Sequence, residues 1–230
     1  MRVDVAFTPA EAVAAPTGLV VDVLRATSTI AQALAGGYGR VLCTAGVEEA
    51  RALRDELGDA TLAGERECVR IPGFDLGNSP ADFAAARGEA VVLTTTNGTR
   101  AILSAAERCD RVFAASLVNL GAFVAAAQES GEDVAILCAG VQGAFTLDDA
   151  YCAGRLVEEL GGAPTDAATA AVRIRQSFAS AYEGLAASRS AANLFGAGLG
   201  RDVEWCSQES LLDVAPRFVG MRGGAAEIGP

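Results

Sequence analysis

The 230-residue chain lacks both lysine and histidine, and all 18 of its basic residues are arginine. The absence of histidine excludes Ser-His-Asp and Cys-His catalysis, histidine general bases and histidine-bound zinc. The absence of lysine excludes the P-loop lysine and lysine Schiff bases. Any chemistry must therefore come from carboxylates, arginines, hydroxyls, thiols, backbone amides or a metal bound by oxygen atoms.

Positive charge is also scarce, since 29 acidic residues outnumber the arginines and the formal net charge is −11. Nucleic-acid-binding proteins usually carry a basic stripe, and anionic membrane surfaces attract basic segments. We find no such stripe and expect neither a nucleic acid nor a membrane as partner. The excess of acid is interpreted as favouring solubility.

No apolar run reaches 18 residues, and the start of the sequence, MRVDVAFTPAEAV, lacks the apolar centre of a signal peptide. The six cysteines include no CxxC pair, and a chain of this size has a core that needs no disulfides. Cys43 and Cys138 end apolar runs, which is typical of buried free thiols. We therefore expect a cytoplasmic, reduced protein.

Short apolar runs alternate with segments of helical periodicity along the chain. Runs that are apolar on both faces are typical of buried parallel strands, and they occupy residues 3–7, 19–23, 41–44, 90–94, 112–115 and 133–138. Helical patterns with apolar residues on one face occupy residues 47–57, 79–87, 99–108, 119–130, 147–160 and 165–183. Ser79 and Thr165 are expected to cap the helices that follow them.

This alternation predicts an α/β fold, layered α/β/α, with a largely parallel or mixed sheet. No long linker divides the sequence, so we expect a single unit over residues 1–230. A strand, a polar loop and a helix recur at 19–36, 90–108 and 133–160. Two related α/β lobes, about 1–118 and 119–230 with the site between them, are therefore an open alternative.

Two polar loops resemble each other in composition. The first, VVDVLRATST at 20–29, places Asp22 at the end of a strand, and then Arg25, Thr27 and Ser28 near the start of a helix. The second is VLTTTNGTRAI at 92–102. An arginine fork, hydroxyls and helix N–H groups form a good oxyanion site. Each loop alone is also explained by helix capping, but the same composition twice weakens that interpretation.

The second loop contributes a set of polar or small residues: Thr95, Asn97, Gly98, Thr99 and Arg100. Gly98 permits a left-handed turn, and successive backbone N–H groups there can bind an anion. We expect this loop to contact an anionic substrate.

Two further segments carry carboxylates. In CAGVQGAFTLDDAYCAG at 138–154, Asp148 and Asp149 start a helix, where paired carboxylates either bind Mg²⁺ or compensate the helix dipole. Gly140 and Gly143 permit close approach of the backbone to a ligand. Residues 64–80, which include Glu65 and Asp75, show no clear periodicity and indicate a functional loop.

Several motifs are absent. DVLRAT departs from the DxDxT of aspartyl-phosphate phosphatases at Leu24, and no cysteine starts a CxxxxxR loop. GAGLG at 196–200 resembles part of a dinucleotide fingerprint but follows a helical pattern rather than a strand. We interpret it as a loop, and an oxidoreductase function would depend on this segment alone.

Four motifs occur in the order DVLRATSTI, GERxxxxIxGFDLGNSP, VLTTTNGTRA and CAGxxGxFxLDDxxCAG. Together with DVEWCSQES and VAPRF near the C-terminus, they resemble the 2-phosphosulfolactate phosphatase (ComB) family. The sequence differs from the family pattern at Cys68, Val141 and Asp148, where glycine, threonine and glutamate are usual. The resemblance implies an α/β fold, a Mg²⁺-dependent acid phosphatase and a role in coenzyme M biosynthesis.

The resulting hypothesis is a Mg²⁺-dependent phosphomonoesterase for a small anionic organic acid, and the resemblance implies hydrolysis of 2-phosphosulfolactate to sulfolactate and phosphate. Arginines would bind the phosphate and a second anion, and Mg²⁺ would orient water. A carboxylate could act as base, or Asp22 could attack phosphorus directly. The alternative is a non-catalytic binder of phosphorylated or sulfonated acids. A homodimer also stays open.

The candidate residues fall into three overlapping sets. The catalytic candidates are Asp22, Arg25, Glu65 and Asp149. The substrate-binding candidates are Arg25, Thr27, Ser28, Asn78, Ser79, Thr95, Asn97, Gly98, Thr99, Arg100, Cys138 and Gly140. The candidate metal ligands are Asp22, Glu65, Asp75, Asp148 and Asp149.

Overall fold

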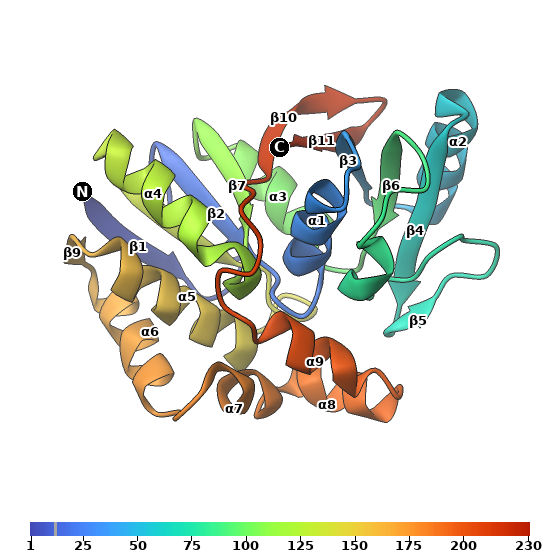
Figure 1. The fold of residues 1–230 in the computed structure, drawn as a ribbon. Helices are drawn as coiled ribbons and strands as arrows, with labels where there is room; N and C mark the ends of the chain where they lie inside the picture. The colour runs from blue at the N-terminus through green and yellow to red at the C-terminus, as the bar shows by residue number, and fades with distance from the viewer. Residues whose placement is uncertain (12) are drawn as a thin grey trace.

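A computed structural model describes residues 1–11 and 13–230 of the chain as helices packed on both faces of one large twisted sheet (Figure 1). The sheet has 11 strands in the order β5-β4-β6-β3-β11-β10-β7-β2-β8-β1-β9. The predicted layered α/β fold with a mixed sheet is confirmed. Within these residues, no helix is long and apolar enough to cross a membrane.

The strands are short and mostly buried. Their bounds are β1 Arg2–Ala6, β2 Thr17–Val21, β3 Arg40–Thr44, β4 Ala60–Arg66, β5 Val69–Arg70, β6 Ala90–Thr94, β7 Arg111–Ala115, β8 Val134–Cys138, β9 Ala163–Pro164, β10 Arg217–Arg222 and β11 Ala225–Gly229. Most neighbours are parallel, but β10 and β11 form an antiparallel hairpin that is inserted between β3 and β7. β5 also pairs with β4 in the antiparallel direction.

The helices divide between the two faces of the sheet. Their bounds are α1 Ala26–Ala35, α2 Val47–Leu57, α3 Gly98–Ala106, α4 Leu120–Ser130, α5 Leu147–Leu160, α6 Asp166–Gln176, α7 Ala181–Ala186, α8 Arg189–Gly196 and α9 Gly200–Cys206, with 3₁₀ turns η1 Pro80–Phe83 and η2 Leu117–Asn119. Successive strand residues point to opposite faces. Thus Val20 packs with α1 and α3, whereas Leu19 and Val21 pack with α4, α5 and α6.

The six predicted strands are all confirmed to within two residues, and so are the helices predicted at 47–57, 99–108, 119–130 and 147–160. The predicted helix 165–183 is two helices, because α6 ends at Gln176 and α7 starts at Ala181. Its predicted cap is confirmed, since the Thr165 hydroxyl accepts a hydrogen bond from the Ala168 N–H.

Two predictions were wrong. The segment 79–87 forms only the short turn η1, and Ser79 does not cap it, because its hydroxyl donates to Asp202 instead. Residues 64–80 are not without regular structure, because they contain the end of β4, all of β5 and a bridge from Leu76 to Ala63. The antiparallel hairpin of β10 and β11 was not predicted.

Candidate functional site

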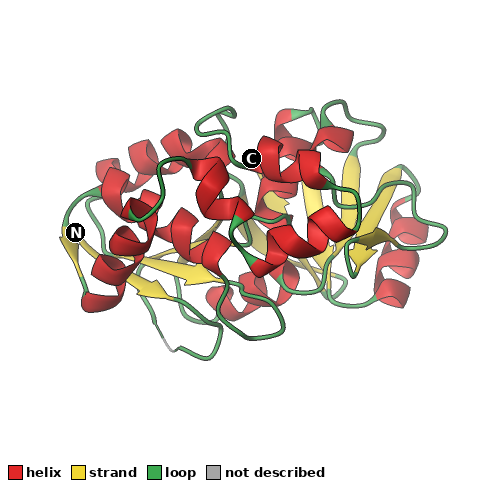
Figure 2. Cartoon of the chain, turned by 90° about the horizontal axis from the view of Figure 1, so that it is seen from below, coloured by secondary structure: helices red, strands yellow, loops and turns green. Residues whose placement is uncertain are grey.

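A cavity of about 610 Å³ lies between strand ends of the sheet and helix α8. Figures 1 and 2 show α7, α8 and α9 lying below the strands, and in the view from below they cross in front of the sheet. The volume falls in the range of small-molecule sites, about 300–1,000 Å³. Its polar lining residues are Asp22, Arg25, Glu65, Glu67, Cys68, Asn78, Thr95, Thr96, Asn97, Gln142, Arg189 and Asn193.

Asp22 directly follows β2, an interior strand of the sheet, and is buried at the cavity wall. Its Oδ1 accepts a hydrogen bond from the Ala26 N–H at 3.3 Å, at the start of α1. Burial raises the pKa of Asp22 to about 7, although the hydrogen bond from Ala26 lowers it. The charges of Asp148 and Glu65 add to the rise. A cation bound at Asp22 would stabilise its ionised form.

Arg25 is buried rather than displayed at the surface. Its Nη1 lies 2.5 Å from Oδ2 of Asp202 in α9, and the two side chains are 3% and 8% exposed. The same carboxylate oxygen accepts a hydrogen bond from the Ser79 hydroxyl at 2.8 Å. Arg25 also lines the cavity, so α9 holds the guanidinium in place there.

Glu65 lies in β4 and lines the cavity, and both of its carboxylate oxygens accept hydrogen bonds. Oε1 accepts from the N–H and hydroxyl of Thr96, and Oε2 accepts from the N–H of Cys68. The side chain therefore joins the loop after β6 to the β4–β5 turn. With two lone pairs on each oxygen, only Oε2 has one left for a further ligand.

Two buried polar atoms at the cavity lack a hydrogen-bond partner within the described chain: the Thr95 hydroxyl and Oδ1 of Asn78. Buried polar groups are nearly always satisfied, so unsatisfied ones call for an explanation. Because both residues line a polar cavity, a bound ligand is the simplest partner. The Thr99 hydroxyl, in α3, is likewise unsatisfied but does not line the cavity.

Other predicted binding residues support the wall rather than line it. The Thr27 hydroxyl accepts from the Asp22 N–H, and the Ser28 hydroxyl donates to the Val23 carbonyl. Gly98 does not adopt the expected left-handed conformation. It is needed because a Cβ there would lie 2.5 Å from Cβ of Ala26 and 2.9 Å from Oδ2 of Asp22.

The two aspartates of α5 are buried behind the cavity. Asp149 accepts hydrogen bonds from the N–H groups of Val23 and Gly140, and burial raises its pKa well above the usual range. Asp148 accepts from the Ser190 hydroxyl of α8, and burial raises its pKa to about 6. Both carboxylates thus hold loops and helices at the site in place.

Three of the remaining candidates lie away from the cavity lining. Asp75 is exposed, and its carboxylate accepts from the Leu62 N–H. Arg100 is exposed on α3. Cys138 is a buried free thiol whose pKa is raised well above the usual range by burial and then by Asp149. Each remains a sequence-based prediction for substrate or metal binding.

The five carboxylates predicted to bind metal do not form one cluster. Within the described residues, no three acidic, cysteine or histidine side chains converge as metal ligands. Asp22 nevertheless suits a hard cation, because it lines the cavity and its Oδ2 accepts no hydrogen bond within the described chain. Mg²⁺ is usually bound by one or two carboxylates together with substrate phosphate and waters.

Several residues at the site had escaped prediction, among them the lining residues Glu67, Cys68, Thr96 and Gln142. Asp202 pairs with Arg25, and Arg189 and Asn193 line the cavity from α8. The sequence DVEWC around Asp202 was noted only as part of the resemblance. The local sequence pattern could not have assigned Asp202 to the site, because its partner Arg25 lies 177 residues earlier in the chain.

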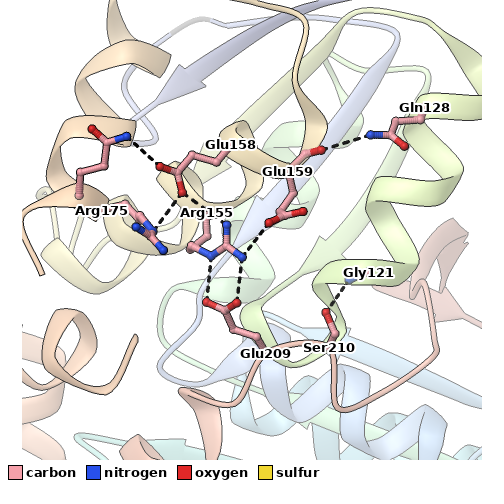
Figure 3. A network of polar contacts seen from close by, with 9 residues as sticks. Gly121, Gln128, Arg155, Glu158, Glu159, Arg175, Glu209 and Ser210 are labelled. Carbon is pink, nitrogen blue, oxygen red and sulfur yellow. Dashed lines mark hydrogen bonds and ion pairs between the residues drawn. The ribbon is translucent and has the colours of Figure 1, made fainter. Parts of the chain in front are cut away.

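A second polar network lies away from the cavity (Figure 3). Nε and Nη2 of Arg155 each donate to Glu209 at 2.9 Å, and Arg155 also contacts Glu158 and Glu159 in α5. Nearby, the Ser210 N–H donates to the Leu117 carbonyl. This network holds the segment after α9 against α4 and α5 and is interpreted as structural.

The chain has close relatives among known proteins. The family described as 2-phosphosulpholactate phosphatase matches residues 5–220. A probable 2-phosphosulfolactate phosphatase of Thermus thermophilus is 41% identical over 233 residues, covering 98% of both chains. The one of Deinococcus radiodurans is 41% identical and covers 87% of both chains, and that of Thermotoga petrophila is 39% identical, covering 94% of this chain and 95% of its own. The resemblance found in the sequence is confirmed.

Proposed function

Because the chain belongs to the 2-phosphosulpholactate phosphatase family, we propose that it hydrolyses the phosphate ester of 2-phosphosulfolactate, a small anionic acid, at the cavity beside Asp22. The observation that carries the proposal is the buried Asp22 carboxylate beside an unsatisfied hydroxyl, that of Thr95, and the held guanidinium of Arg25. The relatives bear the name of this phosphatase. The sequence resemblance further implies that the sulfolactate produced serves coenzyme M synthesis.

In this proposal the phosphoryl group lies between Asp22, Arg25 and Thr95. The Thr95 hydroxyl donates to a phosphate oxygen and so gains the partner it lacks. The N–H groups of the Arg25 guanidinium that do not bond to Asp202 donate to the charged phosphate oxygens. The ion pair with Asp202 fixes the position of this guanidinium. Phosphoryl transfer depends mainly on positioning and on charge stabilisation, so a site without histidine or lysine is sufficient.

We assign Asp22 as the principal protein ligand for Mg²⁺, with Glu65 as a second carboxylate nearby. The ion would neutralise charge on the phosphate and lower the pKa of a bound water. Asp22 holds its position through Ala26 and the close approach of Gly98, so both helix starts orient the carboxylate. Mg²⁺ would also relieve the unfavourable burial of the Asp22 charge.

The reaction adds one water across the ester: a P–O bond forms, the P–O bond to the acid breaks, and the leaving oxygen takes up a proton. Water as nucleophile gives no covalent enzyme intermediate. Direct attack by Asp22 would instead give an acyl phosphate. Hydroxylamine added during turnover distinguishes them, because it converts an acyl phosphate at Asp22 to a hydroxamate that mass spectrometry detects.

The test is phosphate release from 2-phosphosulfolactate with Mg²⁺ and then with excess EDTA. We expect release that EDTA abolishes and added Mg²⁺ restores. Asp22→Asn should lower kcat/KM at least about 100-fold, the loss typical of a group that stabilises transition-state charge. The matched control is Asp82→Asn, the same change at an exposed acid outside the cavity lining. A folded protein that releases no phosphate would refute the proposal.

A further inference from the structure

One face of helix α8 forms a wall of the cavity. The lining residues Arg189, Ala192, Asn193 and Gly196 are spaced at i, i+3, i+4 and i+7, which places them on one side of a helix. Arg189 and Asn193 carry the polar side chains of this face. The opposite walls come from loops at the ends of β2, β4 and β6.

The position of α8 is fixed at its first turn. The Ser188 hydroxyl accepts from the Ala191 N–H at 3.0 Å and caps the helix. The Ser190 hydroxyl donates to Oδ1 of Asp148 at 3.1 Å and joins α8 to the start of α5. With both neighbours of Arg189 bonded in this way, its backbone is held at the edge of the cavity.

The charges around the cavity single out Arg189. The acidic lining residues are Asp22, Glu65 and Glu67, and the basic ones are Arg25 and Arg189. The charge of Arg25 is opposed by Asp202 at 2.5 Å. Within residues 1–11 and 13–230, Arg189 has no carboxylate within ion-pairing distance. Unlike the charge of Arg25, that of Arg189 is therefore not offset by a carboxylate of the described chain.

We propose that Arg189, assisted by Asn193, binds the second acidic group of the substrate, a carboxylate or a sulfonate, while the phosphate lies at Asp22 and Thr95. Arg189 is then a specificity-determining residue that favours phosphate esters carrying a further anion over neutral ones. This inference rests on the phosphatase function proposed above. The planar guanidinium forms two parallel hydrogen bonds to such groups, and the Asn193 amide adds a donor one turn later.

The first experiment compares two esters in wild type and Arg189→Gln: 2-phosphosulfolactate and p-nitrophenyl phosphate, whose leaving group bears no acidic group. We expect the ratio of their kcat/KM values to fall at least tenfold, mainly through KM of the acidic ester, as the loss of a hydrogen bond to a charged group predicts. Arg189→Lys, which keeps the charge, should recover part of the ratio. Arg201→Gln, at an exposed arginine of α9 outside the lining, is the matched control.

A ratio of kcat/KM values that is unchanged in Arg189→Gln, including an equal fall in kcat/KM for both esters, would overturn the inference. A second measurement separates this outcome from a failure of the phosphatase proposal. Sulfoacetate carries a sulfonate and a carboxylate but no phosphate, and its binding is measured by calorimetry without turnover. Binding to wild type that weakens at least tenfold in Arg189→Gln but not in Arg201→Gln supports the inference even if neither ester is hydrolysed. Equal binding to wild type and Arg189→Gln overturns it.

Discussion

Removing one partner of the buried pair between Arg25 and Asp202 should destabilise the fold strongly. The side chains are 3% and 8% exposed, so Asp202→Asn leaves a guanidinium charge with little access to water. Breaking a buried pair from one side typically costs about 3–5 kcal/mol. For a domain of this size each kcal/mol lowers the melting temperature by about 2–4 °C. We therefore expect a decrease of roughly 6–20 °C, measured by thermal denaturation near neutral pH.

The control is Glu132→Gln, which breaks the ion pair between Arg111 and Glu132, whose side chains are 35% and 48% exposed. Exposed pairs contribute about 0–1 kcal/mol, so this variant should melt within about 4 °C of wild type. The double variant Arg25→Met with Asp202→Leu removes both charges and should recover much of the lost stability. If Asp202→Asn melts as wild type does, the pair does not hold α9 to the site.

Three further predictions concern pH and individual residues. In EDTA, the raised pKa of Asp148 means that its protonated form stabilises the fold below pH 3.8, by up to about 3 kcal/mol, and that this contribution is lost as pH rises through about 6. The melting temperature of wild type should therefore fall more between about pH 4 and pH 7 than that of Asp148→Asn. Parallel curves of melting temperature against pH for the two proteins would contradict this. Gly98→Ala should lower the free energy of unfolding measured in urea by about 1–3 kcal/mol and should also lower kcat, because the new Cβ would lie 2.5 Å from Cβ of Ala26 and would displace Asp22. Unchanged stability and kcat would mean that the backbone moves freely at this position. Arg100→Gln should change kcat/KM less than about twofold in the phosphate-release assay, because the exposed side chain lies outside the cavity lining, whereas a tenfold loss would support the sequence-based assignment.

The strands and most helices follow from local pattern because each depends on residues close together in sequence. Val20 lies within a fully buried apolar run, and the run alone predicts β2. The hairpin of β10 and β11 could not be predicted in this way. β10 alternates exposed and half-buried residues, with Val219 and Met221 largely exposed, and the place of the hairpin in the sheet depends on pairing of β10 with β7 and of β11 with β3.

The candidate site was predicted in part for the same reason. Asp22, Thr95 and Asn97 follow parallel strands, and strand ends meet at one edge of a sheet. Long-range partners such as Asp202 and Ser190 carry no local signal. Asp148 and Asp149 show what local sequence leaves open, because a pair of acidic residues at the start of a helix predicts either metal binding or a structural role. Here both accept hydrogen bonds from neighbouring loops and helices.

The insertion of the β10–β11 hairpin has a consequence for biosynthesis. On one side of it lie β3, β6 and β4, which position Thr95 and Glu65, and on the other lie β7 and β2, which position Asp22. A nascent chain that has not yet left the ribosome beyond residue 217 lacks the strands that join these halves. Such pairing between distant segments is slow, because the entropy of closing long loops is lost before contacts compensate. The sheet pairing that links the two halves of the candidate site can therefore form only after residues 217–229 have been translated.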